Sequence, residues 1–337
     1  KQGAYIAALK KWGIEFFYNA ANPTGSILAP IQNQRIDIGC ASEGSVQDVG
    51  GFTTFISQTR LGAGRSVFVI AGLTPQQIST PDIDKILNAD PLTNVFSWTA
   101  NAGSHLLYAI VLPDSEVTLV YDIVSKLWSF FTLLSATETT ATATAVSAAG
   151  VVDSDSHPFS EGDIVKVSGI RYDIDGWYAV LDTTDDTFTI AFSGEAASSV
   201  TGSLTLYEEV YFPIVASVNC AGVQYMQDKT TGSLYSLDQN AFTDYGSRIA
   251  TRAVTGKFDA DTMKTKQLGQ IEVIGDKVGS IGYLRWSDND FVSSSKFKRV
   301  DMSLNRSRVR RTGSFSRRSF EFLHLSDQLV RVEALEI

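Results

Sequence analysis

Apolar and polar residues alternate with a period of two along most of the chain, which predicts β-strands rather than helices. Clear examples of paired strands are residues 52–71, 105–131 and 222–238. Gly, Asn, Asp and Ser interrupt the alternation at short intervals, as they do in tight turns between antiparallel strands. The pattern therefore predicts a chain built mainly of β-hairpins.

The hairpins recur, and several end on a strand that carries an aromatic residue and an Asp. The strands that begin at Phe52 and Phe96 lie about 44 residues apart, within the length of a β-propeller blade. The next comparable strand, Val215–Val218, fits this spacing if roughly 75 residues before it are an insertion. We therefore predict propeller blades in residues 1–134 and 211–337, the second part also containing a C-terminal β-sheet.

The predicted insertion, residues 135–210, has a pattern of its own. Residues 135–150 are rich in Ala and Thr, which predicts an extended linker or an edge strand. Short alternating runs at 158–168, 176–181 and 186–192 predict a small SH3-like β-barrel. Such an insertion costs little, because loop-closure entropy grows slowly with length. We expect the barrel to project outward as a docking module for another protein or a neighbouring subunit.

A short helix is predicted between two blades. Thr80 stands at a capping position and Pro81 at the first helical position, and both Asp82 and Asp84 lie in the first turn. The pattern predicts that this helix runs to Asn88.

The composition is that of a globular protein. Of 337 residues, 44% are hydrophobic and 19% are charged, which is enough apolar material for a core. The sequence contains no apolar run of the roughly 20 residues that a membrane helix needs, so we predict no membrane insertion. Residues 1–30 show no signal-peptide pattern, and a chain that begins at Lys1 is expected to be processed or truncated. The net charge of −9 argues against wrapping DNA by counterion release, but it suits a wall that DNA slides past.

The sequence offers little for metal, cofactor or nucleophile chemistry. His105, His157 and His324 are scattered, and Cys40 and Cys220 form no CxxC pair, so no metal site is predicted. The cysteines are interpreted as buried small apolar residues, although a disulfide between them stays open. No phosphate-binding loop, nucleophile elbow or HExxH helix occurs, and we predict no cofactor.

Paired carboxylates are the remaining candidates for catalysis, because a glycosidase needs two of them at a set separation. The sequence contains three such pairs: Asp114 with Glu116, Asp185 with Asp186, and Glu208 with Glu209. All lie in predicted turns or at domain edges, where acidic residues are normally solvated. We therefore predict no catalytic residue and no enzymatic activity.

The strongest charge cluster is basic and lies in residues 296–318. Its Arg residues alternate with Ser, Val and Phe, which in a strand places charge on one face and apolar groups on the other. Such a face either contacts DNA or pairs with acidic neighbours, and the acidic balance of the chain favours the second interpretation. The candidates for an interface or a DNA channel are Arg306, Arg308, Arg310, Arg311, Arg317 and Arg318.

The segment Trp286–Phe291 resembles an Asp box, a turn found in many β-propellers, in a degraded form. Asp288 is expected to accept backbone N–H bonds within the turn while Trp286 packs beneath it. This role is structural and adds nothing to the case for catalysis.

Several sequence blocks follow one another in a fixed order: Gly39–Asp48, Gly64–Gly72 with Pro75–Pro81, Val120–Asp122 with Leu127–Trp128, Leu284–Asp288, and Arg317–Phe322 with Ser326–Asp327. Together they resemble the tail hub proteins of short-tailed bacteriophages, also called nozzle or packaged-DNA stabilisation proteins. The resemblance covers most of residues 12–134 and 211–337. In this family the opening residues of the chain would lie well inside the propeller, which implies that upstream blades are lacking.

The resemblance implies a structural protein of the phage tail. Such proteins form a ring, usually a homohexamer, below the portal and its adaptor protein. The ring lines the exit channel, retains packaged double-stranded DNA without sequence-specific binding until ejection, and carries tail fibres or spikes. The implied location is the virion, and the host cytoplasm during assembly.

A glycan-binding or glycan-cleaving β-propeller is the alternative, because tryptophans stack on sugar rings. The candidates are Trp12, Trp98, Trp128, Trp177 and Trp286. The competing interpretation is that each tryptophan belongs to a blade core, which fits the usual burial of Trp. A propeller scaffold that binds peptides is a third possibility.

Overall fold

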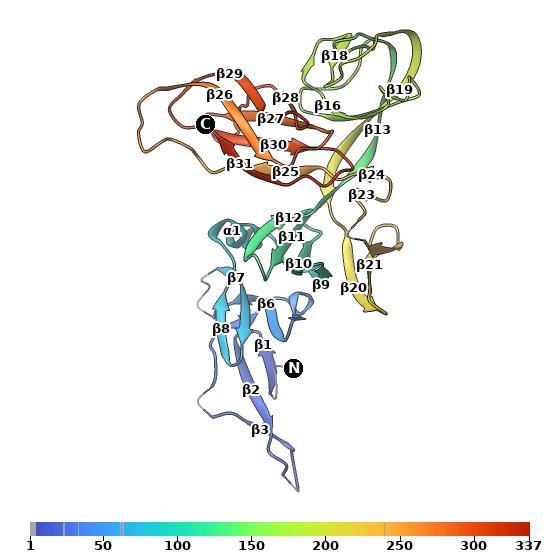
Figure 1. Ribbon diagram of the computed structural model, residues 1–337. Coiled ribbons are helices and arrows are strands. Elements are labelled where there is room, and N and C mark those ends of the chain that lie inside the picture. Colours follow the sequence, from blue (N-terminus) through green and yellow to red (C-terminus); the bar gives the residue numbers. More distant parts are fainter. Residues whose placement is uncertain (1–4, 23, 33, 61, 63, 239) are drawn as a thin grey trace. The chain divides into compact units, whose positions relative to one another are not determined.

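The computed structural model describes residues 5–22, 24–32, 34–60, 62, 64–238 and 240–337 (Figure 1). The chain divides into two compact units. Unit 1 comprises Lys1–Thr132 and Tyr211–Asn240, and unit 2 comprises Leu133–Val210 and Ala241–Ile337. In the part of the chain described, no helix has the length and apolar character needed to cross a membrane.

Unit 1 contains four antiparallel sheets among its described residues, which follow one another along the chain. The first contains β1 (Ile6–Lys10), β2 (Gly13–Asn19) and β3 (Leu28–Pro30). The second contains β4 (Gly39–Cys40), β5 (Gln47–Val49), β6 (Phe52–Gln58), β7 (Arg65–Ala71) and β8 (Thr74–Gln77). The third contains β9 (Phe96–Ala102), β10 (His105–Leu112), β11 (Val117–Asp122) and β12 (Leu127–Phe130). The fourth contains β20 (Ile214–Cys220), β21 (Val223–Asp228) and β22 (Leu234–Leu237). The predicted hairpins at 52–71, 105–131 and 222–238 are confirmed.

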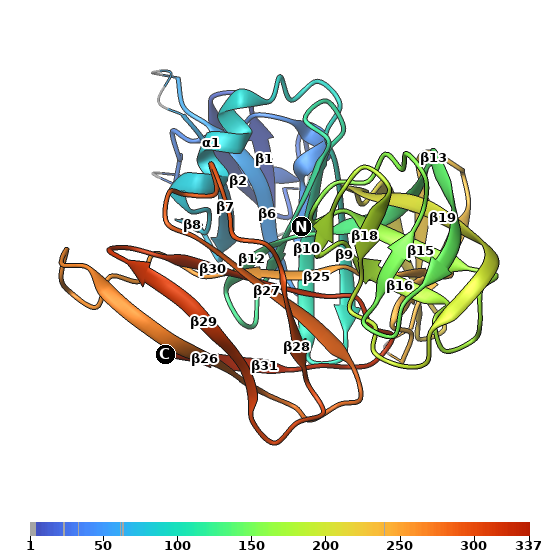
Figure 2. The same cartoon turned by 90° about the horizontal axis from the view of Figure 1, so that it is seen from above.

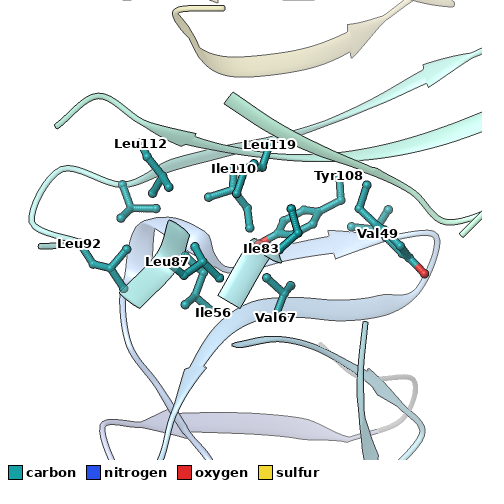
Figure 3. Close-up of a cluster of buried hydrophobic side chains, with 12 residues drawn as sticks. Val49, Ile56, Val67, Ile83, Leu87, Leu92, Tyr108, Ile110, Leu112 and Leu119 are labelled. Carbon is teal, nitrogen blue, oxygen red and sulfur yellow. The ribbon is translucent and has the colours of Figure 1, made fainter. Parts of the chain in front are cut away.

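These sheets stack face to face because alternate residues of one strand enter two different cores. On β6, Phe55 lies in the cluster shared with the first sheet, whereas Ile56 lies in the cluster shared with the third. On β10, Ile110 lies in the cluster between the second and third sheets, whereas Val111 lies in the cluster shared with the fourth sheet. Figure 3 shows the core between the second and third sheets, with Ile56 facing Ile110 and Tyr108. Sheets buried on both faces and stacked in chain order are the packing of propeller blades.

The predicted helix is confirmed as α1 (Pro81–Ala89). Ile83 and Leu87, four residues apart, are buried in the core of Figure 3, so one face of the helix covers it. Thr80 occupies the capping position without a side-chain hydrogen bond to the helix. The Asn88 side chain instead ties the helix to β7, accepting a bond of 2.8 Å from the backbone N–H of Arg65.

Unit 2 begins with a seven-stranded sheet in the order β16-β15-β19-β13-β14-β18-β17. Its strands are β13 (Thr132–Val146), β14 (Val151–Asp153), β15 (Ile164–Ser168), β16 (Gly176–Ala179), β17 (Asp182–Thr183), β18 (Thr187–Thr189) and β19 (Ala197–Tyr211). The sheet surrounds a core that includes Val152, Val165 and Phe188. Among the described residues its end strands β16 and β17 are not paired with each other, so strand pairing does not close the sheet. The prediction of a small SH3-like β-barrel was wrong in this respect.

The prediction of a linker or edge strand at residues 135–150 was wrong. This segment forms most of β13, which lies between β19 and β14 inside the sheet. Thr is a good strand former, and the small Ala143 is fully buried in the core of the sheet. Alternate residues from Ala136 to Thr144 are exposed, so the low content of large apolar residues reflects a strand with one exposed face and not an edge position.

The rest of unit 2 is a β-sandwich. One sheet has the order β25-β30-β27-β28 and the other has the order β29-β26-β31. Their strands are β25 (Thr251–Val254), β26 (Lys266–Gly275), β27 (Ile281–Ser287), β28 (Lys298–Asp301), β29 (Ser307–Phe315), β30 (Ser319–His324) and β31 (Val332–Glu336). A short pair, β23 (Thr243–Asp244) with β24 (Ser247–Arg248), precedes them. Ile271 of β26, Leu284 of β27 and Phe322 of β30 meet in the core between the two sheets.

The seven-stranded sheet packs against the sandwich within unit 2. Ile164 and Ala179 share a buried cluster with Tyr283 and Leu323, which lie on the opposite face of the sandwich sheet from its own core. At the rim, the Lys296 ammonium lies 2.6 Å from the Glu161 carboxylate and also contacts Asp182. Hydrogen bonds to Asp182 and Glu161 raise the pKa of Lys296. One face of the insertion is therefore covered by the sandwich.

A candidate interface on the arginine strand

The first two predicted arginines share one carboxylate. Glu272 on β26 lies opposite Arg308 on β29, and its Oε2 is 2.9 Å from the Arg308 Nε. The same oxygen lies 2.7 Å from Nη2 of Arg306 in the loop before β29. Glu272 is 12% exposed and Arg306 is 61% exposed, so the pair reaches from the sheet surface into solvent. Two of the predicted charges are thus partly balanced within the chain.

Arg310 and Arg311, also on β29, are exposed and make no ion pair within the described part of the chain. Arg311 has φ of 60°, and the pairing with β26 shifts register here, between Leu268 and Gln270. Two β29 residues therefore stand opposite the single Gly269, which defines a β-bulge. Val309 and Thr312 on either side are buried, so the bulge leaves both Arg310 and Arg311 on the exposed side of the strand.

Arg318 differs from the others because it is 3% exposed. Its Nε and Nη2 hold the two Asp288 oxygens at 2.7 and 2.9 Å, and Nη1 donates to the Thr312 carbonyl at 2.6 Å. The guanidinium also lies 4.5 Å from the ring centre of Phe315. Arg318 therefore links the start of β30 to β29 and to the turn after β27, whereas Arg317 next to it is exposed.

The Asp-box-like turn uses different atoms from those expected. Asp288 binds Arg318, and it is the Ser287 hydroxyl that accepts backbone N–H bonds from Asn289 and Phe291, at 3.2 and 2.9 Å. Trp286 is 9% exposed and lies in the sandwich core, as expected. The turn is a structural feature of the sandwich.

A second ion-pair network was not predicted. Glu321 of β30 is 3% exposed and lies between two cations, Arg285 and Arg252. Arg285 Nε is 2.6 Å from one Glu321 oxygen, and Arg252 contacts the other. Arg252 also lies 2.5 Å from Glu209 of β19, and burial together with the charge of Arg252 lowers the pKa of Arg285. The sequence contained one signal for this network: Arg285 and Glu321 are each the single charged residue of an otherwise apolar strand. A charge buried in such a strand needs a partner.

Several members of the three carboxylate pairs have structural partners. Asp114 accepts hydrogen bonds from Asn94 at 3.1 Å and Thr93 at 2.8 Å, and these bonds lower the pKa of Asp114. Asp186 accepts a backbone N–H bond from Ser156 at 3.1 Å. Glu209 belongs to the network described above.

Four of the five tryptophans pack into protein cores. Trp98 and Trp128 contribute to cores of the blade stack, while Trp177 and Trp286 lie in the two clusters of unit 2 that involve the sandwich. Trp12 is 41% exposed, and the Lys11 ammonium lies 5.0 Å from its ring centre. The cores therefore account for most of the tryptophans that a sugar-binding site would use.

Two of the histidines make local contacts, and neither cysteine forms a disulfide. His105 contacts Asp122 at 2.7 Å, and buried His324 lies 3.0 Å from the Ser280 hydroxyl. Both cysteines are free, and Cys220 is exposed, so the prediction that both are buried was wrong for Cys220. Among the described residues, no group of three or more His, Cys, Asp or Glu side chains could hold a metal ion.

The fold is that of a mainly β protein of the β-propeller class, which agrees with the predicted fold class. Residues 1–143 match the model of the phage stabilisation family described as "Bacteriophage P22 Gp10, beta-propeller", which confirms the resemblance predicted from the sequence. The match supports a structural role in a phage for this chain, and with it a place in the virion.

Two further comparisons complete these findings. A search of curated proteins found no match. Among solved structures, the phage phi92 endosialidase aligns with 10% identity and a TM-score of 0.17, covering 85% of this chain and 67% of that one. A TM-score at this level carries no argument about fold or activity.

Proposed function

We propose that the chain is a subunit of a ring in a phage tail, a nozzle or hub that surrounds the DNA exit channel. The ring retains packaged double-stranded DNA until ejection and supports fibres or spikes at its periphery. The match of residues 1–143 to the phage stabilisation family carries this proposal. The blade stack of unit 1 agrees with it, because this family is described as a β-propeller.

The charge of the chain supports a passive channel wall. With a net charge of −9, the subunit repels a duplex overall and does not grip it. Within the arginine set, Arg318 is enclosed and Arg306 and Arg308 share Glu272, which leaves Arg310, Arg311 and Arg317 for contacts outside the chain. We assign these contacts to neighbouring subunits rather than to DNA.

The oligomeric state tests this proposal. The purified chain is analysed by native mass spectrometry and then imaged by cryo-electron microscopy, alone and with the portal-adaptor protein of the same phage. A closed ring, six-fold in the simplest case, with an axial opening that admits duplex DNA is the expected result. A chain that stays monomeric under every condition, including with the adaptor, overturns the proposal.

A further inference from the structure

The three-stranded sheet of the sandwich has two open edges of opposite charge. Its order is β29-β26-β31, and among the described residues neither β29 nor β31 pairs with any strand except β26 (Figure 2). Strand β29 carries Arg308, Arg310 and Arg311 and no acidic residue. Strand β31 carries Glu333 and Glu336 and no basic residue. One edge of the sheet is therefore basic and the other is acidic.

The charged side chains Arg310 and Glu336 lie on the same face of this sheet, the one that points away from the sandwich core. Val309 is buried in the sandwich core and Leu335 packs against it, so their neighbours Arg310 and Glu336 point to the outer face. Glu336 stands opposite Glu272 on β26, which already binds Arg306 and Arg308 on its other side. Glu336 makes no ion pair among the described residues and stands next to a like charge. Glu333 pairs with Arg331 just before β31 at 2.9 Å, whereas Glu336 on one edge and Arg310 and Arg311 on the other have no ion-pair partner among the described residues.

The direction of the strands decides how copies can join. Both β29 and β31 run antiparallel to β26, so they are parallel to each other. A rotation that places a second copy beside the first and continues the sheet brings β29 of one copy next to β31 of the next, in parallel. This contact uses two different surfaces, and it leaves an open edge on each copy for the following one. Such a heterologous contact closes into a ring when the rotation closes.

Like-with-like contacts are disfavoured by the same charges. A two-fold contact between two β29 strands places Arg310 and Arg311 against their own copies, and one between two β31 strands places Glu336 near Glu336. Like charges directly opposite each other on paired strands are destabilising. The charge pattern therefore selects the ring-forming contact over a closed dimer.

We propose that the basic edge strand β29 of one subunit pairs in parallel with the acidic edge strand β31 of the next, with Arg310 and Arg311 facing Glu336. This inference rests on the proposed ring and names the strands that join its subunits. Because β31 has five residues, the pairing covers less area than a standard interface and mainly sets direction and register. The competing explanation is that charged edges prevent edge-to-edge association, which many sheet proteins achieve with charged residues.

Charge reversal separates the two explanations. Arg310→Glu places an acid against Glu336, and Glu336→Lys places a base against Arg310. Each variant is expected to weaken assembly at least roughly tenfold per contact, because it replaces an attractive pair with a repulsive one. Lys85→Glu and Glu208→Lys are the matched controls, since both residues are exposed and neither lies on these two edges. The controls are expected to assemble like the wild type.

Mixing the two variants gives a result that misfolding cannot produce. In a ring in which Arg310→Glu chains alternate with Glu336→Lys chains, every second contact brings the two substituted side chains together as a reversed pair. The remaining contacts keep the original Arg310 and Glu336. Two chains that each fail to assemble are then expected to form rings together, in equal amounts. The double variant Arg310→Glu/Glu336→Lys is expected to assemble alone, because every contact then carries the reversed pair.

Native mass spectrometry and sedimentation velocity at low and high salt provide the measurements. Assembly that is lost in both single variants and restored by mixing supports the proposal. Wild-type rings that persist unchanged in Arg310→Glu and Glu336→Lys overturn the edge pairing and leave the ring itself standing. A single variant that assembles better than the wild type shows that the charges guard the edges, which also overturns the pairing. A wild type that never assembles overturns the ring and the pairing together.

Discussion

Glu321 offers the sharpest test of what holds unit 2 together. The substitution Glu321→Gln keeps the shape of the side chain but removes the negative charge that lies between Arg285 and Arg252. The amide can accept a hydrogen bond from one guanidinium, while its NH₂ group faces the other. Arg285 and Arg252 are 25% and 31% exposed, so they cannot be fully rehydrated where they lie.

The size of the effect follows from this burial. Removing one partner of a buried ion pair costs about 3–5 kcal/mol, and the partial exposure of both arginines reduces the expected loss to about 3 kcal/mol. For a unit of this size the loss lowers the melting temperature of unit 2 by roughly 6–12 °C. The matched control is Glu209→Gln, because Arg252 keeps Glu321 when the 22% exposed Glu209 is neutralised. Its expected cost is below about 1 kcal/mol.

Urea unfolding and calorimetry are the assays, and Trp177 and Trp286 contribute the tryptophan fluorescence of unit 2. The m-value is expected to stay constant, which identifies the change as one of stability rather than of compactness. If Glu321→Gln costs no more than Glu209→Gln, then burial does not set the strength of this network and the reasoning fails.

Three further substitutions have defined outcomes. In Gly39→Ala the added Cβ would collide with the backbone at Lys11, so unit 1 is expected to lose about 1–3 kcal/mol of unfolding free energy. The control Gly256→Ala, where the Cβ would have nothing within 4 Å, is expected to be nearly neutral. Equal effects of the two substitutions in urea unfolding would contradict the close approach at Gly39. Although burial opposes it, hydrogen bonds from Ser125, His105 and Val124 lower the pKa of Asp122 to about 2. The stability that this carboxylate contributes is therefore present above its ordinary pKa of 3.8 and lost as pH falls through about 2. The difference in unfolding free energy between the wild type and Asp122→Asn is expected to shrink over that range. A difference that stays constant with pH would contradict this prediction. Burial lowers the pKa of His324 below 6.5, so unit 2 is expected to lose stability as pH falls below that value, and His324→Gln is expected to flatten the profile; an unchanged profile would refute this.

The strands of unit 1 were predictable because their pattern is local. In β10 every residue from Tyr108 to Leu112 is buried, since the strand lies between two cores, and a continuous apolar run of this length predicts a central strand. The helix α1 was predictable from Pro81 at its first position and from the acidic residues in its first turn. Hairpin neighbours are adjacent in the sequence, so their pairing followed from the turns between them.

The parts that escaped prediction depend on partners far apart in the chain. Nothing within residues 135–150 shows that β19, more than 50 residues later, pairs with one edge of β13. In the same way, the arginines near residue 310 form an evident cluster, but their pairing with Glu272 depends on the register between β26 and β29. The burial of Arg318 depends on Asp288 and on two strand ends that only the tertiary fold brings together.

The position of the insertion has a consequence for synthesis of the chain. The outer face of the third sheet, with Trp98, Val111 and Val120, is covered by Ile214 and Met226 of the fourth sheet. Roughly 80 residues separate the end of the third sheet from Ile214. At a ribosomal rate of about 5–20 residues per second, that apolar face stays uncovered for roughly 4–16 seconds in each nascent chain. During this interval the apolar face can bind chaperones or other nascent chains on the same polysome. A shorter insertion would shorten the time of exposure in proportion.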